Sequence, residues 1–169
     1  MKALIMSEEG FEDSEVLAPY YRLLEAGLEV DVAAISKGPI TGKHGYQVEA
    51  NTTFKKVRPG DYSALIIPGG RAPERVRISK DALRTVKQFM KDDMLVASIC
   101  HGPQVMISAG VLDGRKGTGW KGIQDDMKAA GVRVMDKEVV VDGNWISSRQ
   151  PEDLPAFNRE IMNAIGIVK

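Results

Sequence analysis

Short apolar runs, separated by segments with helical periodicity, constrain the fold of this chain more than any other feature. The runs cover residues 2–7, 28–35, 63–68 and 95–99. A strand that is apolar along its whole length must be covered on both faces, as in parallel sheets. The alternation of runs and helical segments therefore predicts an α/β fold, in which a mostly parallel sheet carries helices on both faces.

The segments outside these runs predict the remaining elements. Asp13 or Ser14 can cap a helix that ends near Ala26, where Gly27 supplies a stop signal. Pro151 suits the first turn of a last helix. Further helices are expected over 79–91, from Cys100 to about 109 and over 121–130. Loops and short strands are expected over 38–53, and Asp142-Gly143-Asn144 predicts a hairpin turn between 138–141 and 145–148.

Composition limits the class of protein. With 169 residues, 43% hydrophobic and 27% charged, the chain is expected to form one globular domain over 1–169. Lys plus Arg equals Asp plus Glu, so neither nucleic acid nor an anionic membrane is expected as a partner. A near-neutral chain self-associates more easily. No signal-like start and no membrane-length apolar run is present, which favours a cytoplasmic location.

Cys100 is the first candidate for chemistry. It is the only cysteine, it follows the apolar run 95–99 directly, and it precedes a predicted helix. A thiol at such a turn is expected to be exposed at the carboxyl edge of the sheet, where the helix N-terminus favours the thiolate. The neighbouring His101 strengthens the interpretation as an activated nucleophile. The alternative is an inert, buried thiol.

Residues after two other strands are expected at the same edge, because sites in such sheets form at the carboxyl ends of strands. Gly69 and Gly70 allow backbone N–H groups to approach a ligand and hold an oxyanion, although they could also be a plain tight loop. Glu15, with Glu12 as a rival, could share a hydrogen bond with the Cys100 sulfur. A protonated carboxyl would stabilise the thiolate and an ionised one would repel it. Ordinary acid enrichment in a first helical turn is the alternative.

His101 is the candidate general acid or base, and Glu74 is a candidate to orient it. His44 is expected to be a loop residue. The two histidines lack zinc-type spacing, and no dinucleotide or phosphate-binding motif is present, so neither a metal nor another cofactor is expected.

These blocks together resemble the PfpI-type intracellular cysteine proteases, within the superfamily that includes the parkinsonism-associated protein deglycase. The likeness runs in order along essentially the whole chain. It is carried by residues 10–15, 40–46, 65–77, 97–104, 112–118 and 140–149.

The resemblance implies a flavodoxin-like three-layer sandwich, related to class I glutamine amidotransferases, with Cys100 on a nucleophile elbow. It implies that Glu15 hydrogen-bonds the thiol and that the N–H groups of Gly70 and His101 hold the oxyanion. It also implies that Glu74 reaches His101 from a neighbouring subunit, in a homodimer that can assemble into a hexamer.

One residue departs from the family pattern. Relatives often carry tyrosine where this chain has Trp120. Indole offers only an N–H donor and more bulk, so substrate preference is expected to differ.

Three functions follow from the resemblance and the residues. The first is a cysteine hydrolase that cleaves peptide or amide bonds through an acyl-enzyme on Cys100. The second is a cofactor-independent glyoxalase or protein deglycase that acts on methylglyoxal or its adducts. The third is not enzymatic: a redox-sensing or stress-chaperone protein in which Cys100 is oxidised to a sulfinate that Glu15 stabilises.

Overall fold

A seven-stranded sheet forms the centre of the molecule in the computed structural model, which describes residues 1–166. The strand order is β10-β11-β7-β6-β1-β2-β5, and every neighbouring pair is parallel except β10 and β11. The chain passes from β1 to β2 on one side and returns to β6 on the other. The strands are β1 (Lys2–Met6), β2 (Glu29–Ala34), β5 (Thr52–Thr53), β6 (Ala64–Ile67), β7 (Leu95–Ile99), β10 (Val140–Asp142) and β11 (Trp145–Ser148).

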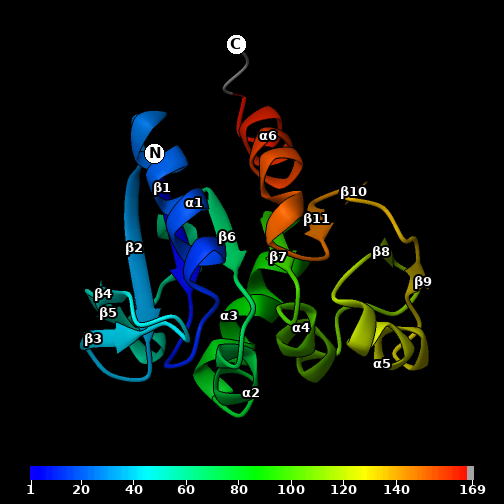
Figure 1. The fold of residues 1–169 in the computed structure, drawn as a ribbon, viewed down its shortest axis with the longest axis horizontal. Coiled ribbons are helices and arrows are strands. Elements are labelled where there is room, and N and C mark those ends of the chain that lie inside the picture. The colour runs from blue at the N-terminus through cyan, green and yellow to red at the C-terminus, as the bar shows by residue number, and fades with distance from the viewer. Residues whose placement is uncertain (167–169) are drawn as a thin grey trace.

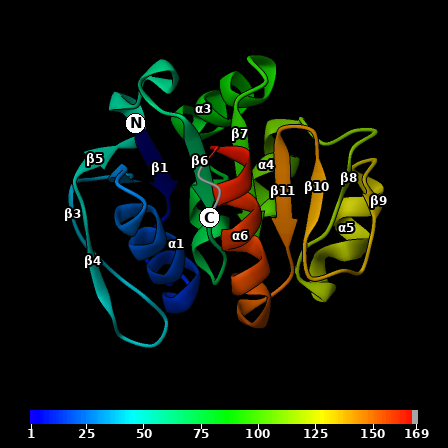
Figure 2. The same cartoon turned by 90° about the horizontal axis from the view of Figure 1, so that it is seen from above.

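Helices cover both faces of this sheet (Figures 1 and 2). α1 (Asp13–Glu25) and α6 (Leu154–Ala164) lie on one face, whereas α3 (Lys80–Lys91) and α4 (Pro103–Ala109) lie on the other. The short helices α2 (Ala72–Val76) and α5 (Gln124–Ala129) pack beside α4. The predicted three-layer α/β sandwich is therefore confirmed. Among residues 1–166, no helix has the length and apolar character needed to cross a membrane.

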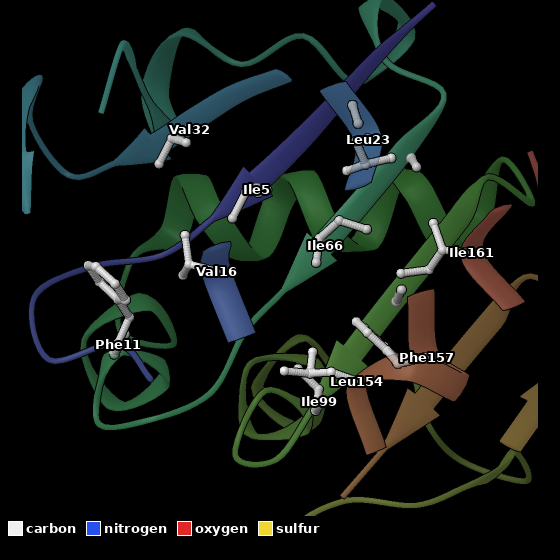
Figure 3. Close-up of a cluster of buried hydrophobic side chains, with 14 of the residues drawn as sticks. Ile5, Phe11, Val16, Leu23, Val32, Ile66, Ile99, Leu154, Phe157 and Ile161 are labelled. Carbon is white, nitrogen blue, oxygen red and sulfur yellow. The ribbon is translucent and has the colours of Figure 1, made fainter. Parts of the chain in front are cut away.

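The alternation of side chains along β1 explains why its sequence is apolar from Ala3 to Met6. Ala3 and Ile5 enter the core under α1 and α6, shown in Figure 3, and Leu4 and Met6 enter the core under α3 and α4. All four are fully buried. Burying one such aliphatic side chain contributes about 1.5–3 kcal/mol, so both cores hold the strand in register.

Smaller elements complete the fold. β3 (Gly38–Thr41) pairs antiparallel with β4 (Gln47–Ala50), and β8 (Lys116–Gly117) pairs parallel with β9 (Arg133–Val134). The predicted hairpin is confirmed, although Asp142 belongs to β10 and not to the turn. Short 3-10 turns occupy Phe54–Lys56, Pro59–Asp61, Lys121–Ile123 and Pro151–Asp153.

The β3–β4 hairpin is tied to the acidic residues at the start of α1 and just before it. A carboxyl oxygen of Glu9 accepts the N–H of Thr41, and the two carboxyl oxygens of Asp13 accept the N–H groups of His44 and Tyr46 at 3.0 Å each. The prediction that Asp13 or Ser14 caps the helix is wrong, since Glu12 is the N-cap residue and makes no side-chain capping bond. Glu9 and Asp13 thus hold a hairpin that is distant in the sequence.

Candidate active site

Cys100 lies on a sharp turn between β7 and α4. Its φ of 61° is in the left-handed region, which only strong surrounding contacts maintain for a side chain other than glycine. The Cys100 N–H donates to the carbonyl of Ser148 at 3.1 Å, and the Gly102 N–H donates to that of Ile99 at 2.8 Å. A Cβ at Gly102 would lie 2.3 Å from the Ile67 carbonyl oxygen, so glycine is required there.

The thiol is more enclosed than the sequence predicts. Only 8% of Cys100 is exposed, so the expectation of an exposed sulfur is wrong, because neighbouring loops close over the strand end. Burial, followed by the charge of Glu15, raises the pKa of the thiol to about 12, while the N–H groups of Gly70 and His101 and the charge of Lys43 lower it. Burial therefore outweighs the lowering of the thiol pKa that was expected from the helix N-terminus.

Glu15 is fully buried beside the thiol, in the first turn of α1. Its Oε1 accepts the Gly69 N–H at 2.9 Å, whereas Oε2 is buried with no hydrogen-bond partner of ordinary geometry. Burial raises the pKa of Glu15 to about 8, the charge of Glu12 adds to this, and the Gly69 N–H and a weak interaction with the Cys100 thiol act against it. Near neutral pH this carboxyl holds its proton, the form that can donate to a thiolate.

The two glycines after β6 have different functions in the fold. Gly69 is unavailable as an oxyanion donor because its N–H is taken by Glu15. Gly70 has a φ of +80°, and its N–H acts on the Cys100 sulfur together with that of His101. A Cβ on Gly70 would come within 2.3 Å of the Glu12 nitrogen, so this approach requires glycine. The N–H groups of Gly70 and His101 are thus both directed at the sulfur, and their use as oxyanion donors stays a prediction.

Glu12 pairs with a residue of the β3–β4 hairpin rather than with the thiol. Lys43 Nζ lies 2.7 Å from Glu12 Oε2, and His44 Nε2 lies 3.4 Å from the same oxygen. Burial raises the pKa of Glu12, but the hydrogen bond and charge of Lys43, with a hydrogen bond from Ser14, outweigh it and lower the pKa overall. Near neutral pH Glu12 is therefore ionised, whereas Glu15 is protonated.

His101 folds back toward the residue that precedes it. Its Nδ1 lies 3.3 Å from the Cys100 sulfur, and its ring stacks on Trp120 at 6.2 Å between centroids. Burial lowers the pKa of His101, Lys43 adds to this, and Glu74 opposes it. Glu74 is exposed and no hydrogen bond joins it to His101 within residues 1–166, so the predicted orienting contact is not made inside one chain.

These residues line one hollow of about 560 Å³ at the carboxyl ends of the strands. It brings together Cys100, His101, Glu74, Glu15, Gly70, Trp120 and Glu12, the site residues expected from the sequence, whereas Gly69 does not line it. The lining residues are Glu12, Glu15, Lys43, Gly70, Arg71, Glu74, Cys100, His101, Trp120, Gln150, Pro151 and Glu152. A hollow of about 810 Å³ at the opposite, amino ends of the strands is larger, but no cysteine or histidine lines it. The nucleophile therefore identifies the smaller hollow as the candidate site.

Three charged lining residues had no role assigned from the sequence, namely Lys43, Arg71 and Glu152. Lys43 and Arg71 come from loops whose position over Cys100 depends on long-range contacts, such as the hydrogen bond from the Lys43 N–H to the Phe11 carbonyl at 2.9 Å. No local pattern marks them. Within residues 1–166, no group of three or more His, Cys, Asp or Glu side chains is arranged to hold a metal ion.

Residues 1–164 match the model of the DJ-1/PfpI family. The chain belongs to this family. The resemblance inferred from the sequence is thereby confirmed over residues 1–164.

Relatives in this family carry different activity names. "Deglycase PfpI" of Pyrococcus furiosus is 54% identical over 165 residues, which cover 98% of this chain and 99% of that one. "Putative cysteine protease YraA" of Bacillus subtilis is 38% identical and covers 97% and 98%. A two-domain Anabaena variabilis protein with DJ-1/ThiJ/PfpI-like and ferritin-like domains superposes with a TM-score of 0.97 at 38% identity, over 98% of this chain and 50% of that chain. The flavodoxin-like fold is therefore confirmed.

Proposed function

We propose that this protein is a cysteine-dependent enzyme that acts on small carbonyl compounds, as a glyoxalase or deglycase. The observation that supports this most directly is the enclosure of the Cys100 sulfur between two backbone N–H groups and the neutral Glu15 carboxyl, inside a hollow of about 560 Å³. An aldehyde fits such a space more easily than a folded peptide segment. The 54% identical relative named as a deglycase supports the same activity.

The proposed reaction begins with transfer of the thiol proton to His101 Nδ1, which lies 3.3 Å away and belongs to a neutral imidazole. The Cys100 sulfur then bonds to the aldehyde carbon of methylglyoxal, and the carbonyl π electrons move to oxygen. The N–H groups of Gly70 and His101 hold this oxyanion until a proton returns to it.

The remaining steps move two protons and add one water molecule. A proton leaves the former aldehyde carbon and the neighbouring ketone oxygen is protonated, which gives an enediol. A proton is then delivered to the former ketone carbon while the hydroxyl on the sulfur-bearing carbon loses its proton, which gives a lactoyl thioester. Glu15 and His101 are the proposed carriers. Water cleaves the thioester, so that methylglyoxal and water yield lactate and the thiol is restored.

Peptide or amide hydrolysis is the second candidate. The same two N–H groups would hold a tetrahedral oxyanion, the His101 imidazolium would protonate the leaving amine, and Glu74 would orient His101 from another subunit. The 38% identical relative with a cysteine protease name supports this alternative.

One paired assay tests both. Wild type and Cys100→Ser are compared for lactate formed from methylglyoxal without glutathione, and for cleavage of a fluorogenic peptide. We expect lactate from the wild type alone and no peptide cleavage. Thiol-dependent peptide cleavage without lactate would favour the hydrolase. If neither reaction occurs and dilute peroxide adds oxygen to Cys100 alone, the redox-sensor function would replace both.

A further inference from the structure

Of the two cations that line the hollow, Lys43 and Arg71, the Lys43 ammonium group is the one whose charge acts on Cys100. It lies on the wall that the β3–β4 hairpin contributes, and it lines the same space as Cys100 and His101. Its charge acts on four ionisable groups of the site, which are Glu12, Glu15, Cys100 and His101. Any negative charge that enters or forms beside the sulfur therefore lies within the field of Lys43.

Lys43 is the more exposed end of its ion pair with Glu12, although both residues line the hollow. The Lys43 side chain is 39% exposed, whereas that of its partner Glu12 is 9% exposed, and the two are 2.7 Å apart. Glu12 also accepts a hydrogen bond from Ser14 on its other oxygen at 3.2 Å. The carboxylate is thus held within the protein by several donors, while the ammonium group retains solvated N–H donors for another anion.

The hairpin holds this ammonium group in place. Asp13 accepts the N–H groups on both sides of the turn, from His44 and Tyr46, and the Lys43 N–H donates to the Phe11 carbonyl. A Cβ at Gly42 would lie 2.1 Å from Asp13 Oδ1, so the carboxylate is packed directly against the turn. Lys43 consequently extends from a fixed backbone, which lowers the entropy lost when it binds a charged group.

We propose that Lys43 determines the charge preference of this hollow: its ammonium group binds a carboxylate on the carbon adjacent to the one that Cys100 attacks. Reactants and products that carry this group are therefore preferred over neutral molecules of the same shape. The class includes α-oxo acids, in which a carboxylate is bonded to the carbonyl carbon that the sulfur attacks. The relevance to turnover rests on the proposed function, in which the sulfur attacks a carbonyl carbon.

Two alkylating reagents test the preference without any turnover. Iodoacetate and iodoacetamide both alkylate the Cys100 thiolate, which displaces iodide from the attacked carbon. A carboxylate lies beside that carbon in iodoacetate, and an amide in iodoacetamide. Both rate constants are proportional to the fraction of Cys100 that is ionised, so their ratio at one pH does not depend on the pKa of the thiol. Intact-protein mass spectrometry follows the single cysteine.

The ratio of the iodoacetate rate to the iodoacetamide rate is expected to fall roughly 3- to 10-fold in Lys43→Met, as for removal of one partly screened charge near the sulfur. Lys43→Arg should retain most of the ratio. The matched control is Lys37→Met, which removes an exposed lysine outside the hollow and should leave the ratio unchanged. Glu12→Gln should raise it, because the competing carboxylate is removed.

An unchanged ratio in Lys43→Met, or an equal fall in Lys43→Arg, would overturn the proposal. If Lys43→Met fails to fold, the wild type still provides a test, since added sodium chloride should lower its ratio by screening the ammonium charge. A salt-independent ratio would also overturn it. Failure of the proposed function is seen separately, as absence of lactate from the wild type or as lactate formation that survives Cys100→Ser.

Discussion

The Cys100 sulfur and His101 Nδ1 lie 3.3 Å apart even though the two residues are neighbours in the chain. The positive φ of Cys100 makes this possible, because it turns the backbone sharply between the two side chains. Neighbours on a regular helix or strand would point in different directions. The elbow therefore forms a thiol–imidazole pair from two consecutive residues.

This pair predicts a large kinetic effect of His101→Gln. We expect kcat/KM for the thiol-dependent reaction to fall roughly 100- to 10,000-fold, the usual contribution of a positioned general base. Circular dichroism should be unchanged, since the ring is only half-buried. Added imidazole should restore part of the activity of His101→Ala. Full activity of His101→Gln would show that another group takes the thiol proton.

The raised pKa of Glu15 predicts that the free energy of unfolding depends on pH. Its pKa is about 8 in the folded chain against 4.5 for a free glutamate, so the folded state binds the extra proton. The stabilisation is complete below pH 4.5 and is lost as the pH rises through 8. Glu15→Gln does not titrate, so its free energy of unfolding relative to wild type should increase from pH 5 to pH 8, by up to about 1.4 kcal/mol per pH unit.

Urea unfolding at pH 5, 6, 7, 8 and 9 measures this difference between Glu15→Gln and wild type. Above pH 8 the difference should level off. A constant difference across the range would mean that Glu15 is ionised in the folded protein, and the proposed neutral donor to the thiolate would have to be abandoned.

Gly70 and Gly27 form a matched pair for the close approach at the site. Their φ angles are +80° and +87°, but a Cβ at Gly27 would meet no atom within 4 Å, whereas one at Gly70 would meet the Glu12 nitrogen at 2.3 Å. Gly27→Ala should cost about 1–2 kcal/mol, from the left-handed backbone alone. Gly70→Ala should cost at least about 2 kcal/mol more, as measured by urea unfolding. Equal costs would contradict the packing described here.

The stack of His101 on Trp120 gives an optical measure of the histidine charge. Because burial and then Lys43 lower the pKa of His101, its protonation should begin only below pH 6.5. The imidazolium would then quench Trp120, which lies 6.2 Å away. A fluorescence titration should show a step below pH 6.5 that disappears in His101→Gln. A step above pH 6.5 would contradict the lowered pKa.

Glu74 and Glu152 test the proposed subunit-shared site. Both are exposed carboxylates that line the hollow, and neither forms an ion pair within residues 1–166. If Glu74 orients His101 across an interface, Glu74→Ala should reduce activity or the mass measured by light scattering, while leaving the thiol reactive toward iodoacetamide. Glu152→Ala should change neither. Full activity and unchanged mass in Glu74→Ala would exclude Glu74 from the site.

Much of the fold could be predicted because the strongest signals are local. The runs that became β1, β6 and β7 are apolar at nearly every position, since alternate side chains enter different cores. The position of Cys100 at the end of β7, and of Glu15 in the first turn of α1, follows from the same reasoning. By contrast, α2, β8 and β9 have two to five residues each, which is too short for a hydrophobic periodicity to be recognised.

The electrostatics of the site could not be predicted in the same way. The sequence shows acids before a helix, but it does not show that Asp13 holds a hairpin or that Glu12 meets Lys43, since each contact joins residues about 30 positions apart. The burial of the Cys100 thiol likewise depends on which loops close over the strand end. Charge and burial at this site are properties of the tertiary structure.

The backbone at Cys100 implies a trade-off between stability and chemistry. Holding a residue with a Cβ at a φ of 61° costs about 1–2 kcal/mol that glycine would not incur. Cys100→Gly should therefore produce a more heat-resistant but inactive protein, despite the small cavity that it leaves. The molecule keeps its reactive atom at the expense of thermal tolerance, and attempts to stabilise it should be directed to positions away from the elbow.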